Sequence, residues 1–167
     1  GALTLHTDPP GARVRIYRYE LRRRRLVPVY WQILGQTPLD AVPLPIGSYL
    51  LSIHHSDRAP VRYPIFIERQ KHWDGRPPGG SAPHPIYLPT RRELSSSEDY
   101  IPAGWYWSGG DRDAGRSLPR QRLWVAGMVL GRFPVTNAEY IAFLDDLVAN
   151  GREDAALRYA PRDHPTH

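Results

Sequence analysis

LTLHTDPPGARVRIYRY, residues 3–19, is the stretch that decides the fold. Its first and last parts alternate apolar and polar residues, which is the pattern of a strand with one buried face. Between these parts stands Asp8-Pro9-Pro10-Gly11, in which proline presets a turn and glycine tolerates a positive φ. The stretch therefore predicts two neighbouring strands, Leu3–Thr7 and Val14–Tyr19, joined by a sharp reversal.

More short strands are expected downstream of this stretch. Apolar or alternating runs, separated by turns that contain glycine or proline, occupy residues 26–34, 49–54, 61–67 and 86–88. Because Pro64 has no amide hydrogen to give to a sheet, its strand is expected at an edge or with a bulge. Five or six short strands with frequent turns predict a small β-sandwich over residues 1–90.

Composition divides the chain into two parts. Of its 18 prolines, 13 lie before residue 90. Residues 1–92 carry 14 basic and 6 acidic side chains, a net charge of +8, whereas residues 93–167 carry 8 and 11, a net charge of −3. The polar stretch 91–98 has no hydrophobic period and is interpreted as a linker. We therefore predict domains at residues 1–90 and 99–167.

The second part contains one clear helix signal. Thr136 and Glu139 have the spacing of a capping box, and apolar residues then recur every three or four positions from Tyr140 to Val148. Asn150-Gly151 supplies a stop. A strand interrupted by Gly127 is expected over residues 122–130, and a second short helix over residues 152–159.

Three motifs in the first part resemble the PEGA domain. They are Thr7-Asp8-Pro9-Pro10-Gly11-Ala12, Gly35-Gln36-Thr37-Pro38-Leu39, and Leu44-Pro45 followed by Gly47 and Tyr49. Pro10 stands where that family usually has glutamate. The resemblance covers residues 1–90. It implies a small β-sandwich that serves as a non-catalytic accessory module in bacterial multidomain proteins.

The second part resembles the start of a formylglycine-generating enzyme domain, of the sulfatase-modifying-factor family. The motifs are Ile101-Pro102-Ala103-Gly104, Leu118-Pro119-Arg120, and the run from Phe133 to Leu144 with Val135-Thr136-Asn137 at its centre. The resemblance covers residues 99–167. It implies the N-terminal part of that domain, as an irregular α+β segment. The fold class expected for the whole chain is mainly β.

The order of the two resemblances is similar to that in bacterial serine/threonine protein kinases fused to a formylglycine-generating-enzyme-like domain. Gly1 is no initiator, and the chain has neither a Gly-rich phosphate loop nor an HRD or DFG motif. We therefore expect the chain to begin inside a longer protein, with any kinase domain outside it. The enzyme family oxidises a substrate cysteine with copper held by two cysteines, and this chain has none. The resemblance therefore implies no catalytic residue, cofactor site or metal site here, although a complete family domain could hold copper and calcium.

One cluster of basic residues is the candidate site. Arg22, Arg23, Arg24 and Arg25 follow a predicted strand and could contact phosphate or another anion. The alternative interpretation is a charged hairpin tip that discourages pairing at the sheet edge.

Aromatic and histidine side chains give weaker hypotheses. Trp105-Tyr106-Trp107 could form a platform for stacking a sugar, but a core position is expected because tryptophan buries a large area. The adjacent His54-His55, and His164 and His167 on the tail, are expected to be ordinary surface residues and not metal ligands.

These observations predict a non-catalytic accessory or interaction region of a bacterial signalling protein. Two alternatives stay open: part of an active formylglycine-generating oxidase whose cysteines lie elsewhere, and a polyanion-binding module. The expected partner is a protein or another domain of the parent chain, and nucleic acid is not expected because no helix-turn-helix or RNA-binding signature occurs. No apolar run approaches the ~20 residues that span a bilayer, and the expected location is cytoplasmic.

Overall fold

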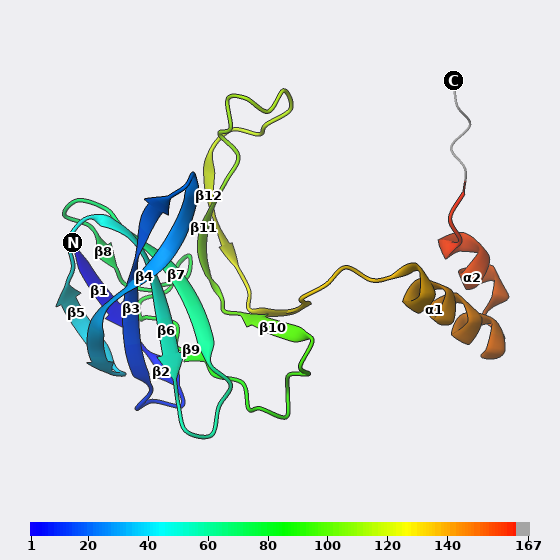
Figure 1. The fold of residues 1–167 in the computed structure, drawn as a ribbon, viewed down its shortest axis with the longest axis horizontal. Coiled ribbons are helices and arrows are strands. Elements are labelled where there is room, and N and C mark those ends of the chain that lie inside the picture. The colour runs from blue at the N-terminus through cyan, green and yellow to red at the C-terminus, as the bar shows by residue number, and fades with distance from the viewer. Residues whose placement is uncertain (163–167) are drawn as a thin grey trace. The chain divides into compact units, whose positions relative to one another are not determined.

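The computed structural model describes residues 1–162 and divides the chain into two compact units (Figure 1). Unit 1 comprises Gly1–Gly131, and unit 2 begins at Arg132. Strands hold 44% and helices 12% of the residues, so the predicted fold class, mainly β, is confirmed. His164 and His167 lie outside the described residues.

Unit 1 is built from strands and unit 2 from two helices. The strands are β1 (Ala2–Leu5), β2 (Thr7–Asp8), β3 (Arg13–Arg22), β4 (Arg25–Gln36), β5 (Leu39–Pro43), β6 (Gly47–His54), β7 (Val61–Ile67), β8 (His72–Trp73), β9 (Ile86–Tyr87), β10 (Glu98–Ile101), β11 (Gly104–Ser108), β12 (Gln121–Val125) and β13 (Met128–Gly131). The helices are α1 (Asn137–Ala149) and α2 (Glu153–Tyr159).

The core of unit 1 lies between two sheets. The larger sheet has the order β4-β3-β6-β7 and is antiparallel throughout. In the smaller sheet, β1 is antiparallel to β5 and parallel to β8. Buried side chains of both sheets, among them Leu3, Ile16 and Leu51, form one hydrophobic cluster. The first 90 residues therefore form a β-sandwich, as the alternating runs and turns predict.

Alternation along β7 shows how the sequence assigns one face of the larger sheet to the core. Val61, Tyr63, Ile65 and Ile67 are buried, whereas Arg62, Pro64 and Phe66 are exposed. β7 is an edge strand of this sheet, which confirms the position predicted from Pro64. The exposed residues of β7 are consequently available to line a surface feature.

Two buried threonines join the turn after β2 to the turn before β5. The Thr7 hydroxyl donates to the Pro9 carbonyl at 2.7 Å, and the Thr37 hydroxyl contacts Thr7 Oγ1. Thr37 Oγ1 also accepts from the Ala12 amide at 3.0 Å. The Thr7 and Thr37 hydroxyls thus each donate one hydrogen bond and accept another. These hydrogen bonds satisfy the polar groups that the two turns bury.

Strands β10 to β13 belong to the same compact unit as the sandwich. β10 pairs with β13, and β11 pairs with β12, all antiparallel. Trp105 Nε1 donates to the Arg76 carbonyl at 2.7 Å, and the rings of Tyr87 and Tyr100 lie 6.1 Å apart. A Cβ at Gly104 would come within 3.0 Å of the Tyr63 hydroxyl, so glycine permits this close approach. The linker at residues 91–98 stays a prediction about domain organisation.

Unit 2 confirms the predicted capping box. Thr136 is the N-cap of α1: its Oγ1 accepts from the Glu139 amide, while the Glu139 carboxylate accepts from the Thr136 amide at 2.8 Å. These hydrogen bonds lower the pKa of Glu139. The helix ends at Asn150, and Gly151 follows with φ 70°. Neither helix of the described chain is long and apolar enough to cross a bilayer.

Candidate functional site

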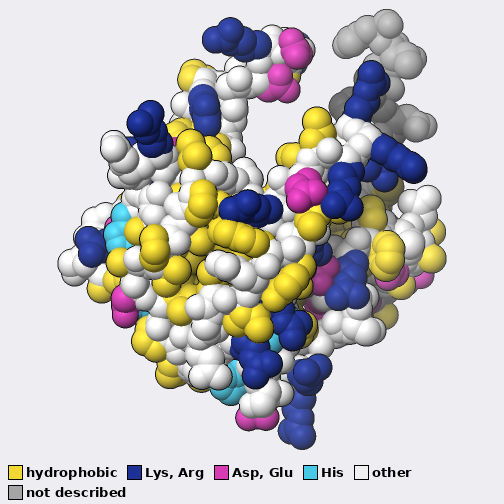
Figure 2. Space-filling model, turned by 60° about the vertical axis from the view of Figure 1, so that its left-hand side comes forward, with side chains coloured by type: hydrophobic (Ala, Val, Ile, Leu, Met, Phe, Trp, Pro, Cys, Tyr) yellow, Lys and Arg dark blue, Asp and Glu magenta, His cyan; other side chains and the backbone are white. Residues whose placement is uncertain are grey.

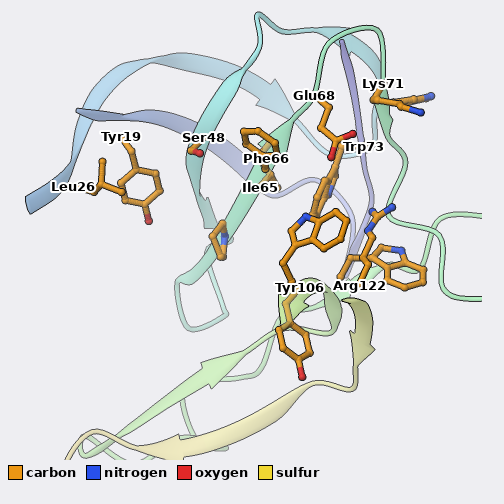
Figure 3. Close-up of a pocket in the computed structure, with 14 residues that line it drawn as sticks. Tyr19, Leu26, Ser48, Ile65, Phe66, Glu68, Lys71, Trp73, Tyr106 and Arg122 are labelled. Carbon is orange, nitrogen blue, oxygen red and sulfur yellow. The ribbon is translucent and has the colours of Figure 1, made fainter. Parts of the chain in front are cut away.

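A cleft of about 530 Å³ opens within unit 1, against the outer face of the larger sheet (Figure 3). We call it the aromatic cleft. It is lined by Tyr19, Leu26, Ser48, Pro64, Ile65, Phe66, Glu68, Lys71, His72, Trp73, Trp105, Tyr106, Trp107 and Arg122. The volume falls within the range of ~300–1,000 Å³ that is usual for ligand sites.

The sheet forms one wall of the aromatic cleft. Tyr19 and Leu26 lie on the β3–β4 hairpin at one end, and Trp73 lies at the other end (Figure 3). Between them, Phe66 of β7 stands opposite Ser48 of β6 in the sheet register, and 41% of Phe66 is exposed. The wall is apolar because the side of the strands that faces away from the core also carries large hydrophobic residues.

The β11–β12 hairpin forms the opposite wall and carries an alternating stack of tryptophan and arginine. Trp105 stands opposite Trp124, and Trp107 stands opposite Arg122, so these four residues share one face of the hairpin. The Arg122 guanidinium lies 4.6 Å from the Trp105 ring centroid, and the Arg120 guanidinium lies 4.3 Å from that of Trp107. We call these five residues the tryptophan–arginine ladder.

The ladder fixes the positions of its charged groups. Each guanidinium lies over an indole, an arrangement worth about 0.5–1 kcal/mol when exposed and about 2 kcal/mol when desolvated. The Trp105 and Trp124 rings meet edge to face at 5.5 Å, which adds a rigid aromatic contact. The arginine side chains are thus held by the hairpin itself before any ligand arrives.

Trp73 lines the cleft, and its indole N–H is buried beneath the cleft surface. Its Nε1 is buried and, within residues 1–162, has no hydrogen-bond partner. The Tyr63 ring lies edge to face with it at 6.3 Å. The interaction between the Tyr63 hydroxyl and Trp73 is weak, since no hydrogen bond between them meets the usual geometry. A buried indole N–H without a well-placed acceptor is costly.

Tyr63 packs against Trp73, which lines the cleft, and its pKa is perturbed. Burial raises the pKa of Tyr63 to about 12, and the smaller effects of Trp73 and Arg122 oppose this rise. In the unfolded chain the same phenol ionises near pH 10. Because the folded pKa is the higher one, Tyr63 contributes stability that is complete below about pH 10 and is lost as the pH rises to about 12.

We expect this loss to be measurable by comparing the protein with Tyr63→Phe. The absorbance at 295 nm should contain one transition with its midpoint near pH 12 that the variant lacks. Between about pH 10 and pH 12, the melting temperature should fall more steeply in the unmodified protein than in the variant. Identical absorbance titrations of the two proteins would contradict the assignment.

The four candidate arginines lie together at the tip of the β3–β4 hairpin. Arg22 pairs with Arg25 in the register, and Arg23 and Arg24 form the turn with φ values of 48° and 63°. The predicted hairpin tip is confirmed. Both turn residues adopt the left-handed conformation that such two-residue turns require and that glycine or asparagine adopts more easily. Arg22 forms an ion pair with Glu20 at 3.0 Å. Anion binding by this tip stays a prediction.

The core position expected for the aromatic run is wrong for two of its three members. Tyr106 is 45% exposed and Trp107 is 46% exposed. Neighbouring side chains in a strand point to opposite sides of it, so the Tyr106 side chain lies on the face opposite to that of Trp105 and Trp107. The local sequence was rich in aromatic residues, but it could not indicate that this hairpin lies at the surface.

The cleft holds no arrangement typical of catalysis. Its ionisable lining residues are Glu68, Lys71, His72 and Arg122, with the phenols of Tyr19 and Tyr106, and His72 Nε2 is hydrogen-bonded to Thr4 Oγ1 at 2.8 Å. Ser48 is the serine among the lining residues, and the lining histidine, His72, is hydrogen-bonded to Thr4 instead. Across residues 1–162, no group of three or more histidine, cysteine, aspartate or glutamate side chains could hold a metal ion.

Comparison with models of protein families, with curated proteins and with solved structures finds no match to this chain.

Proposed function

We propose that this chain is a non-catalytic interaction region of a bacterial multidomain signalling protein, and that it binds its partner in the aromatic cleft. The proposed parent is a cytoplasmic serine/threonine protein kinase with a formylglycine-generating-enzyme-like domain. The partner is a protein or another domain of the parent chain. This proposal combines the sequence resemblances with the binding geometry of unit 1.

The observation that carries the proposal is the aromatic cleft itself. Large apolar side chains are exposed on both walls, Phe66 on the sheet and Trp107 on the hairpin. Figure 2 shows hydrophobic side chains gathered across one face of the molecule, with Lys and Arg side chains beside them. Concave apolar surfaces with a few fixed polar groups are typical of binding sites. The lack of a nucleophile paired with a base supports binding over catalysis.

Screening the 1–167 chain against a random peptide library and a glycan array tests the proposal. We expect at least one ligand whose binding falls about tenfold or more in Phe66→Ala, because that change removes apolar surface from the cleft wall. Phe133→Ala is the matched control, since Phe133 is 78% exposed and lies in unit 2. Circular dichroism checks that both variants fold.

Two results would contradict the proposal. The first is that no peptide or glycan binds, or that every ligand binds equally to Phe66→Ala and to the unmodified chain. The second is that the chain oxidises a cysteine-containing sulfatase peptide in the presence of Cu(I), which would support the alternative of an active oxidase. Binding of a polyanion that is lost when Arg22–Arg25 are replaced by glutamine would favour the polyanion alternative instead.

A further inference from the structure

The charged groups in and beside the cleft are mostly basic. Of the two ladder arginines, Arg122 lines the cleft, and Arg120 lies over the ring of Trp107, which also lines it. Ion pairs within residues 1–162 include His6–Asp40, Arg22–Glu20 and Arg76–Asp74. Arg120 and Arg122 are in none of them, and each is in contact with an indole ring instead. Lys71 adds a second positive charge to the cleft lining beside Arg122, against the single carboxylate of Glu68.

A guanidinium that lies over an indole keeps its N–H edges free. Stacking uses the planar face of the group, whereas hydrogen bonds to a carboxylate use the edge. The two contacts are therefore compatible, and the indole restricts the guanidinium before a carboxylate binds. Less conformational entropy is then lost on binding.

The same stacking argues against a sugar platform. A sugar ring would lie on the broad face of a tryptophan, but guanidinium groups lie over the rings of Trp105 and Trp107 at 4.6 and 4.3 Å. The remaining features of the cleft fit a polypeptide better. Phe66 and Leu26 are exposed in the cleft and offer contacts for an apolar side chain of a peptide.

On the basis of the proposed function, we propose that the aromatic cleft binds an extended acidic peptide segment that carries an apolar anchor residue. The carboxylates bind the edges of the Arg120 and Arg122 guanidinium groups. The anchor side chain packs on the sheet wall around Phe66. Charge complementarity selects the acidic peptide, and the apolar wall distinguishes it from a simple polyanion.

The test compares peptides selected from the random library with their neutral twins. Each selected peptide is synthesised twice, once as found and once with glutamine and asparagine in place of glutamate and aspartate. Polyglutamate serves as a probe with charge and no anchor. Binding to the 1–167 chain is measured by calorimetry at low and at physiological salt, because ionic contacts weaken with salt.

We expect selected peptides to be rich in acidic residues and to bind at least tenfold more tightly than their neutral twins. Arg122→Gln and Arg120→Gln should each weaken binding about tenfold. Arg13→Gln is the matched control and should not weaken binding. It removes the same charge at the start of β3, and Arg13 neither lines the cleft nor belongs to the tryptophan–arginine ladder. Polyglutamate should bind weakly, and its binding should not depend on Phe66.

Other outcomes separate this inference from the proposed function. Equal binding of acidic and neutral twins, or glycan binding that depends on Phe66, would overturn the acidic-peptide inference and keep the cleft as a binding site. Tight polyglutamate binding that is unaffected by Phe66→Ala would overturn it in favour of a simple polyanion site. If no ligand of any class binds, both proposals fail.

Discussion

Replacing Leu51 by alanine is expected to lower the free energy of unfolding of unit 1 by about 3 kcal/mol. Leu51 lies in β6, has no exposed surface and belongs to the hydrophobic cluster between the two sheets. In the sheet register it stands between Ile16 of β3 and Tyr63 of β7, both of which are buried. Neighbours on two sides fix the backbone, so a cavity left by the lost methyl groups can close only in part.

Urea unfolding followed by circular dichroism measures this effect. With a slope of about 1–3 kcal/mol per molar urea, the midpoint should fall by roughly 1–3 M. Leu21→Ala is the matched control, because Leu21 is 73% exposed near the tip of the β3–β4 hairpin, and its loss should cost at most about 0.5 kcal/mol. Equal losses in the two variants would show that the core does not lie between these sheets.

Replacing Thr37 by valine is expected to lower the free energy of unfolding by about 2 kcal/mol. Valine has nearly the shape of threonine, so packing is preserved and the change removes the hydroxyl alone. The Ala12 amide, which is fully buried, then loses the oxygen that it donates to at 3.0 Å. The Thr7 hydroxyl loses a partner as well. A buried donor without an acceptor carries most of the cost.

A double-mutant cycle with Thr7→Val isolates the contact between the two hydroxyls. The double variant should lose less than the sum of the single losses, because either change alone already breaks the shared hydrogen bond. Thr37→Ser keeps the oxygen and should retain more stability than Thr37→Val. Strictly additive losses in urea unfolding would mean that the two hydroxyls act independently.

The predicted sandwich strands depend on local patterns, which explains why the sequence indicates them well. Along Val61–Ile67 the alternation of burial is complete, and the structure has a strand with the same bounds. The helix from Asn137 is predicted equally well, because its capping box needs only residues that lie within one helical turn. By contrast, the strands β10 and β11 were not predicted. β10 pairs with β13 across a long stretch of chain, and no local period marks such a pairing.

The candidate arginines illustrate the limit of local sequence for the site. Their place at a hairpin tip follows from the strands on either side, and the register confirms it. The arginines at the aromatic cleft are different ones: Arg122 lines it, and Arg120 stacks on its lining residue Trp107. Nothing in their immediate neighbours marks them. The signal that could have found them is the spacing of Trp105, Trp107, Arg122 and Trp124, which alternates as two strands of a hairpin would.

The sequence by itself determined the alternating strands, the turns and the capped helix of this protein, because each of these depends on residues close together in the chain. Only the tertiary structure decided where the aromatic cleft lies and which side chains line it. Its walls join Tyr19 and Phe66 of the sandwich to Trp107 and Arg122 of a later hairpin. The cleft exists because glycine at position 104 and the Trp105 hydrogen bond to Arg76 let that hairpin approach the sheet closely. Such contacts between distant segments form no pattern that can be read along the chain.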